Sequence, residues 1–272
     1  MTIKTKPSSI FDFNSILDKD YQDLNKKREG WYPIMYYNED VALENKNYIT
    51  MGINPSLTTK AKTKINKIFE IKFDVDIDGK GEERFNKFNS NGQYRQIKNK
   101  LIEFQNELKY DDEDQIVYFK TLENFFKSVG KNFQEEVFHY DFCQLRNTAS
   151  GDIKKEILKN DNYYNLLCKH FDDITELINP DYIFIFNATL LKILIKNNFF
   201  ERIPKPQDKG FEDKFGIKSK DDFEYYNEFM DDNGVCKRKG MKFIVGNQLS
   251  SGATSRVYRA NLIANVRRLL NS

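Results

Sequence analysis

The stretch NYITMGINPSLTT, residues 47–59, decides the fold class of this chain. Its apolar run stops abruptly at Gly52, where a missing side chain lets a backbone turn or approach a ligand closely. Pro55 fixes its own φ angle and biases Asn54 toward an extended conformation. The pattern predicts a buried strand over residues 41–51 that ends in a stiff turn presenting Asn54. A plain tight turn with an Asx hydrogen bond is the alternative interpretation.

Three later apolar stretches also run into small polar residues. They are EEVFHYDFCQLRNT (135–148), DYIFIFNATLLKILIKN (181–197) and MKFIVGNQLSSGATS (241–255). Segments with helical periodicity separate or follow them, at 9–29, 58–72, 94–109, 115–129, 161–180 and 255–272. Near-continuous apolar strands alternating with helices are typical of a parallel sheet that is buried on both faces. We therefore expect an α/β fold, a three-layer αβα arrangement around a mostly parallel, four-stranded sheet, with a binding crevice at the carboxyl ends of its strands.

The length of the chain, 272 residues, is sufficient for one large α/β domain. We expect a single domain over residues 1–272, with a helical N-terminal extension at about 1–40. The region at about 199–240 contains two prolines and many charges, and it is expected to be a peripheral inserted segment.

The composition excludes several classes of protein. No apolar run is long enough to span a bilayer and the first residues do not resemble a signal peptide, so we expect a cytoplasmic protein. Three scattered cysteines cannot form a four-cysteine cluster and indicate reduced thiols, and there are only two histidines. We expect no metal site. The formal net charge of +2 does not by itself indicate a nucleic-acid-binding protein, although residues 255–272 carry four arginines and no acid.

The ordered strand ends resemble a known family. Gly52-Ile53-Asn54-Pro55-Ser56 is similar to the first motif of the uracil-DNA glycosylase superfamily, closest to its mismatch-specific and single-strand-selective branches. VFHYDFCQLRNT resembles the second strand of that family, and PDYIFIFNATLLKIL resembles its third strand and helix. FIVGNQLSSGATS occupies the place of the fourth motif, which is usually His-Pro-Ser. The resemblance covers residues 41–270 and implies a uracil-DNA glycosylase-like fold.

The resemblance implies two catalytic residues. Asn54 would orient a water beneath C1′ of a flipped nucleotide and stabilise an oxocarbenium-like sugar. Gln248 takes the place of the motif histidine and would donate one neutral hydrogen bond to O2 of the departing base, with Asn247 as an alternative donor. A turn role for Asn54 and a plain loop over 246–252 remain open.

The base-reading position falls on Asp141, where the family usually has Asn. A carboxylate cannot donate to O4 of uracil, but it can accept from the exocyclic amine of a cytosine, which is worth about 1–3 kcal/mol of discrimination. The excised base is therefore expected to be a modified or damaged, cytosine-like base rather than plain uracil. Phe142 joins the base-recognition set, and Tyr94 is the expected stacking aromatic. A structural pairing of Asp141 with Arg146 is the alternative.

Contacts with DNA phosphates are expected in two places. Ser56 follows the first motif, and the second set consists of Ser250, Ser251, Gly252 and Arg256. Hydroxyl and guanidinium groups bind phosphate oxygens, and glycine lets the backbone approach them. A solvated helix face is an equal alternative for Arg256 and Arg259.

The expected function is that of a monofunctional DNA glycosylase, a hydrolase that flips a nucleotide and leaves an abasic site in DNA repair or anti-phage defence. It would act as a monomer on DNA, without a metal or a cofactor. A non-catalytic DNA-binding or partner-binding protein on the same fold is the first alternative, and classical uracil excision is a further one. An α/β enzyme for a nucleotide or sugar is the last, and no GxGxxG or GxxxxGKS pattern supports it.

Overall fold

The structure is a computed structural model, and it describes residues 6–25, 34–55, 63–65, 67, 97–111, 113, 115–145, 150–203, 228–231, 233–246, 249 and 256–271. The described residues belong to two compact units. Unit 1 is drawn from Met1–Ala42, Asn54–Asp114 and Asp141–Leu177, and unit 2 is drawn from Leu43–Ile53, Gln115–Tyr140 and Ile178–Ser272. The expectation of a single domain stays a prediction.

The core of unit 2 is a five-stranded mixed sheet. Its strands are β1 (Tyr48–Gly52), β2 (Val137–Asp141), β3 (Tyr182–Ile185), β4 (Val235–Arg238) and β5 (Met241–Val245), in the order β2-β1-β3-β5-β4. Strands β1 and β3 pair in parallel, as do β3 and β5, whereas β4 is antiparallel to β5. The α/β class is confirmed, but the expected number of four strands is wrong.

The additional strand, β4, forms a hairpin with β5. Lys239 and Gly240 connect the two strands with φ angles of +49° and +80°. Two consecutive positive φ angles are typical of the type I′ turn that suits the twist of a hairpin. The described ends of the segment 199–240 thus include a strand of the sheet, and residues 204–227 lie outside the described part.

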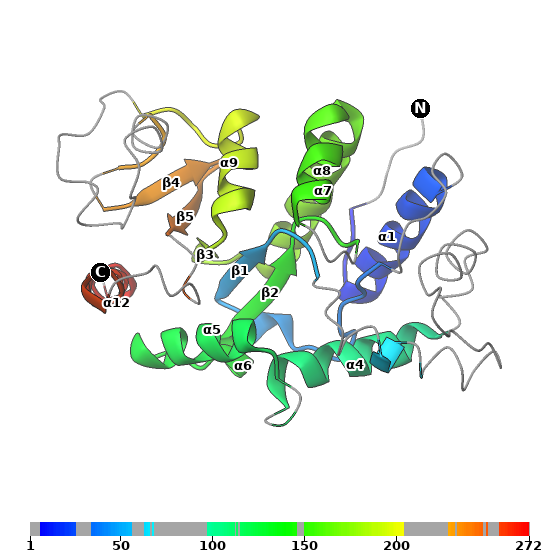
Figure 1. The fold of residues 1–272 in the computed structure, drawn as a ribbon, viewed down its shortest axis with the longest axis horizontal. Coiled ribbons are helices and arrows are strands. Elements are labelled where there is room, and N and C mark those ends of the chain that lie inside the picture. The colour runs from blue at the N-terminus through cyan, green and yellow to red at the C-terminus, as the bar shows by residue number, and fades with distance from the viewer. Residues whose placement is uncertain are drawn as a thin grey trace. The chain divides into compact units, whose positions relative to one another are not determined.

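Helices cover both faces of this sheet, as Figure 1 shows for α5 (Val117–Ser128) and α9 (Ala188–Lys196). On one face, the rings of Phe125 and Phe126 from α5 lie 6.2 and 5.1 Å from the ring of Phe184 in β3. On the other face, Phe199 and Phe200, which follow α9, contact Phe243 of β5. Burial of each such ring contributes roughly 1.5–3 kcal/mol to the free energy of folding.

Local signals fix where several elements of unit 2 begin. Asn132 caps the short α6 (Phe133–Glu136), because its side chain accepts hydrogen bonds from the first free amides of the helix. A 3-10 turn, η1 (Leu43–Asn45), precedes β1, so this strand begins later than the expected residue 41. Strand β2 is likewise shorter than the expected 135–148. The chain of unit 2 ends in α12 (Arg256–Leu270).

Unit 1 is mainly helical. Among the residues that the structure describes, its longer helices are α1 (Ile10–Asn25), α4 (Lys98–Tyr110), α7 (Ser150–Lys159) and α8 (Asp161–Ile178), the last of which ends at the boundary with unit 2. Helices α1 and α8 meet at His170, whose ring contacts the rings of Phe13 and Tyr21 and whose Nε2 lies 3.0 Å from Asp20 Oδ2. Among the described residues, no helix is both long and apolar enough to cross a membrane.

Candidate functional site

The strand order creates a topological switch point next to β1. The sheet is extended from β1 by β2 on one side and by β3 on the other. In sheets of this type, ligands bind outside the carboxyl ends of the strands that flank such a point. The parallel strands β1 and β3 reach it at Gly52 and Ile185. The GINPS segment singled out in the sequence therefore begins at the carboxyl end of a strand that flanks the switch point.

Asn54 is the second residue beyond β1 and is half-buried. Its Nδ2 donates a hydrogen bond of 3.1 Å to the carbonyl oxygen of Pro55. This local bond agrees with a turn role for Asn54 and also orients the amide group. An amide held in one orientation is what the positioning of a water molecule requires.

Asp141 is the last residue of β2, and its side chain is buried with 3% exposed. The carbonyl oxygen of Asp141 accepts a hydrogen bond of 2.8 Å from Nε2 of Gln144. The adjacent Phe142 is fully buried, and its ring lies 6.1 Å from the ring of Tyr164 on α8. Base recognition by Asp141 and Phe142 stays a prediction.

A buried polar cluster surrounds the end of β2 within unit 1. The hydroxyl of Tyr21 donates to Gln144 Oε1 at 2.9 Å, and Cys143 Sγ lies 2.9 Å from the Tyr163 hydroxyl. Burial is the largest cause that raises the pKa of Tyr21, Tyr37 and Tyr163 well above the ordinary value. For Tyr37, the nearby Asp141 carboxylate is the second cause that raises the pKa. These phenols therefore stay protonated at neutral pH, and the Tyr21 hydroxyl donates to Gln144 in that state.

This cluster was not predicted from the sequence. The only signal was the polar Gln144 inside the otherwise apolar run FCQL, because a polar residue in such a run needs a buried partner. Tyr21, which is 123 residues away in sequence, carries no comparable signal.

The edge strand β2 and its neighbour β1 are linked by a side-chain hydrogen bond. Thr50 Oγ1 on β1 lies 2.9 Å from His139 Nδ1 on β2, and both side chains are buried. The His139 ring packs edge-on against Phe119 of α5, with 4.8 Å between ring centroids. His139 thus has a packing role, and no group of three His, Cys, Asp or Glu side chains suited to a metal ion occurs among the described residues.

The ends of β3 and β5 carry structural hydrogen bonds. Asn187 caps α9, because its Oδ1 accepts from the amide of Leu190 at 2.9 Å. The amide of Gly246 donates to the carbonyl of Ile185 at 3.0 Å, which extends the β3–β5 pairing by one residue. These two polar strand ends therefore stabilise the fold at the edge where a ligand is expected.

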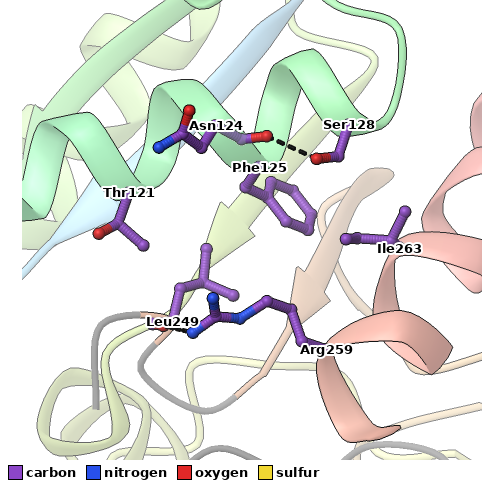
Figure 2. A pocket seen from close by; sticks show the side chains of 7 residues that line it. All are labelled: Thr121, Asn124, Phe125, Ser128, Leu249, Arg259 and Ile263. Atoms are coloured by element: carbon purple, nitrogen blue, oxygen red, sulfur yellow. Dashed lines mark hydrogen bonds between the residues drawn. The ribbon is translucent and has the colours of Figure 1, made fainter. Parts of the chain in front are cut away.

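A pocket of about 170 Å³ lies within unit 2 between α5, α12 and Leu249 (Figure 2). Figure 2 shows that α5 supplies Thr121, Asn124, Phe125 and Ser128, and that α12 supplies Arg259 and Ile263. One guanidinium, one amide and two hydroxyls thus share the lining with apolar side chains. Leu249 stands between Gln248 and Ser250 in the sequence, so it belongs to the segment that occupies the place of the fourth motif.

Three arginines of α12 donate hydrogen bonds within the protein. Arg259 Nη2 donates to the carbonyl of Leu249, Arg267 Nε donates to the carbonyl of Ser128 at 2.8 Å, and Arg268 Nη2 donates to Asn233 Oδ1 at 2.6 Å. Charge-assisted bonds of this kind are stronger than neutral ones. These bonds hold α12 within unit 2, and the phosphate contacts expected for Arg256 and Arg259 stay predictions.

Several expected site residues lie outside the described part of the chain. They are Tyr94, Ser56, Gln248, Ser250, Ser251 and Gly252, together with Arg146 and Asn247. Arg256 begins α12, but its side chain is also outside the description. The roles expected for these residues stay predictions.

Comparison with known proteins found no matching protein family and no matching curated protein.

Proposed function

We propose that the protein is a DNA glycosylase that flips a nucleotide and hydrolyses its N-glycosidic bond, leaving an abasic site. The observation that carries the proposal is the position of Asn54, two residues beyond a parallel strand that borders a topological switch point. That position is where α/β sheets bind ligands, and the segment Gly52 to Ser56 resembles the first glycosylase motif there.

Asn54 would act after the bond between C1′ and the base nitrogen begins to break. The bonding electron pair leaves with the base, and the sugar becomes an oxocarbenium-like cation. The amide carbonyl of Asn54 holds a water and stabilises the developing positive charge. Water then adds to C1′ and releases a proton, while the base takes up a proton at its departing nitrogen. An amide suits this order of events because it is a poor base but a good orienting group.

Asp141 would select the base. Its buried carboxyl can accept a hydrogen bond from the exocyclic amine of cytosine, and it would face O4 of uracil with an unfavourable charge. A hydrogen bond made in a buried site is stronger than the same bond in water. The preferred substrate is therefore a cytosine-like base that is modified or damaged.

The biological setting follows from the substrate. An enzyme that excised plain cytosine would damage the DNA of its own cell, whereas a modified cytosine, such as those that some phages carry, marks foreign or damaged DNA. The proposal therefore places the protein in anti-phage defence or DNA repair, acting on a flipped nucleotide without a metal or cofactor.

An alkali-cleavage assay tests the proposal. The substrates are oligonucleotides that contain uracil, unmodified cytosine, hydroxymethylcytosine or glucosylated hydroxymethylcytosine. We expect cleavage of a modified-cytosine substrate by the wild type and its loss in Asn54→Ala. Asn106→Ala is the matched control, because Asn106 lies within α4, a helix that carries none of the proposed site residues, and it should remain active.

Two outcomes of this assay would contradict parts of the proposal. Wild-type protein that cleaves none of the substrates, yet binds the same oligonucleotides in a fluorescence-anisotropy titration, contradicts the glycosylase proposal and favours the non-catalytic DNA-binding alternative. Cleavage of uracil alone contradicts the assignment of Asp141 and favours classical uracil excision.

A further inference from the structure

The buried side chain of Gln144 bridges the turn that follows β2. Gln144 has none of its surface exposed, and its Nε2 folds back over the turn to the carbonyl of Asp141 at 2.8 Å, with a weaker 3.5 Å contact to the carbonyl of Phe142. A side-chain amide that bonds the carbonyl three residues earlier closes the turn on itself. It restricts the backbone on the carboxyl side of Asp141.

The side-chain oxygen, the backbone amide and the backbone carbonyl of Gln144 also make hydrogen bonds. The Tyr21 hydroxyl on α1 donates to Gln144 Oε1 at 2.9 Å and accepts from the backbone N–H of Gln144 at 3.3 Å. The amide of Met35 donates to the carbonyl of Gln144 at 2.7 Å, next to the antiparallel bridge between Ile34 and Leu145. Buried amides are costly to leave without partners, so this set of bonds specifies one conformation of the turn.

The position of the Asp141 carboxyl depends on this turn. Asp141 ends β2, so strand pairing holds the backbone before it and Gln144 holds the backbone after it. The direction of the bond from Cα to Cβ follows from the backbone, and a buried side chain has few rotamers to choose from. A change at Gln144 would therefore move the carboxyl of Asp141 without removing it.

We infer that Gln144 is a positioning residue that aims the Asp141 carboxyl at the base, with Tyr21 holding Gln144 in place. The inference rests on the proposed function, because it gives Asp141 the task of reading the base. Gln144 itself does not touch the base; it acts through the Asp141 backbone. Its contribution is to specificity and to the rate of the chemical step, since supporting residues of this kind control how accurately a functional group is held.

Two variants test the inference. Gln144→Met keeps the approximate volume and removes the hydrogen bonds, and Tyr21→Phe removes only the hydroxyl that bonds Gln144. The matched control is Tyr36→Phe, which removes a part-buried hydroxyl that donates to Asp18 of α1, the helix that also carries Tyr21. For each protein, we would measure the rates of single-turnover cleavage of modified-cytosine and uracil oligonucleotides. DNA affinity and hydrogen exchange of the backbone amides at 142–145 would be measured on the same proteins.

A displaced carboxyl should reduce the preference for the modified cytosine over uracil. We expect about a tenfold loss of this rate ratio in Tyr21→Phe, which removes the 2.9 Å bond to Gln144 Oε1 and the longer bond from the Gln144 backbone amide, and about a hundredfold loss in Gln144→Met. DNA affinity should change less than twofold, whereas amide exchange over 142–145 should become faster. Tyr36→Phe should show the wild-type ratio and wild-type exchange.

The possible failures are distinguishable. Wild-type protein that cleaves no substrate overturns the proposed function, and this result is visible before any variant is measured. If the wild type is active and both folded variants keep its ratio of modified-cytosine to uracil cleavage rates, the positioning role of Gln144 is overturned. The proposed glycosylase function is not affected by that result. If Gln144→Met does not fold, the ratio measured for Tyr21→Phe decides the question, because that change removes a single oxygen atom.

Discussion

Arg259 Nη2 on α12 lies 2.5 Å from the carbonyl oxygen of Leu249 and donates a hydrogen bond to it. The Leu249 side chain is buried, so the residue is held both by its backbone and by its packing. This contact attaches α12 to the segment that occupies the place of the fourth glycosylase motif, and both belong to unit 2.

Arg259→Ala should therefore destabilise unit 2. A hydrogen bond from a charged donor contributes about 1.5–3 kcal/mol when buried, and the exposure of Arg259 lowers the expected loss to about 1 kcal/mol of unfolding free energy. Urea denaturation followed by circular dichroism measures this loss. Lys100→Ala, which breaks the exposed Lys100–Glu103 pair, is the control and should stay within about 0.5 kcal/mol of the wild type.

Thr50→Val should cost about 1–3 kcal/mol of unfolding free energy, because the substitution keeps the volume but breaks the buried bond to His139. The measurement is again a urea denaturation curve. Thr175→Val is the matched control: the Thr175 hydroxyl bonds only backbone carbonyls of its own helix, so its loss should cost less than about 1 kcal/mol. Equal losses in the two variants would contradict a special role for the bond between β1 and β2.

Stability should decrease on acidification because of His170. Burial is the first cause that lowers the pKa of His170 below its usual 6.5, and the nearby Asp20 opposes this effect. Below pH 6.5 the unfolded chain takes up a proton that the folded protein resists, so the folding free energy becomes less favourable as the pH falls, and above pH 6.5 the effect disappears. Lys169 and Asp173 are the other charged groups that act on His170.

A melting-temperature series from pH 7.5 to pH 5.5 measures this effect. The decrease should be smaller in His170→Gln, which cannot be protonated. Because other groups also titrate in this range, the quantity compared is the slope of melting temperature against pH in the wild type and in His170→Gln. Identical slopes for the wild type and His170→Gln would contradict the prediction.

The three thiols should differ in reactivity. Burial raises the pKa of Cys143 to about 11 and also raises the pKa of Cys236, whereas Cys168 is only half-buried. Since the thiolate is the reactive form, iodoacetamide at pH 8 should label Cys168 first in the native protein and all three thiols after denaturation. Peptide mass spectrometry identifies the labelled residues, and rapid native labelling of Cys143 would contradict its burial.

Asp141→Asn should change base preference. An amide can both donate to O4 and accept from N3–H of uracil, so the variant should gain uracil excision and lose activity on the modified cytosine by about 10-fold to 100-fold, equivalent to 1–3 kcal/mol. The alkali-cleavage assay measures both activities, and the Asn54→Ala variant supplies the background. An unchanged base preference would remove Asp141 from the recognition set.

The sequence was most informative where a strand is buried on both faces. The apolar runs of β1, β3 and β5 are near-continuous, so their strands could be predicted together with the helices that follow β3 and β5. Strand β4 was missed because Lys237 and Arg238 make a four-residue edge strand resemble a charged loop. Helix α7, at 150–159, was also not predicted.

The candidate site was only partly predictable, for a physical reason. A polar residue at a strand end, such as Asp141, can be recognised from the local pattern alone. The bond between Tyr21 and Gln144 joins residues 123 positions apart, and it exists only because the fold brings α1 to the end of β2. No local property of either residue specifies that partner.

The division of the chain into two compact units affects how the protein can fold. Each unit is drawn from three separate stretches of sequence, so neither unit corresponds to one continuous fragment. In unit 2, strand β1 must find β3 across more than a hundred intervening residues before the sheet can form. Chains dominated by such distant pairings have high contact order and fold slowly, on a timescale of about milliseconds to seconds. During synthesis, β1 therefore leaves the ribosome long before its partner strand β3 is available to protect its edge.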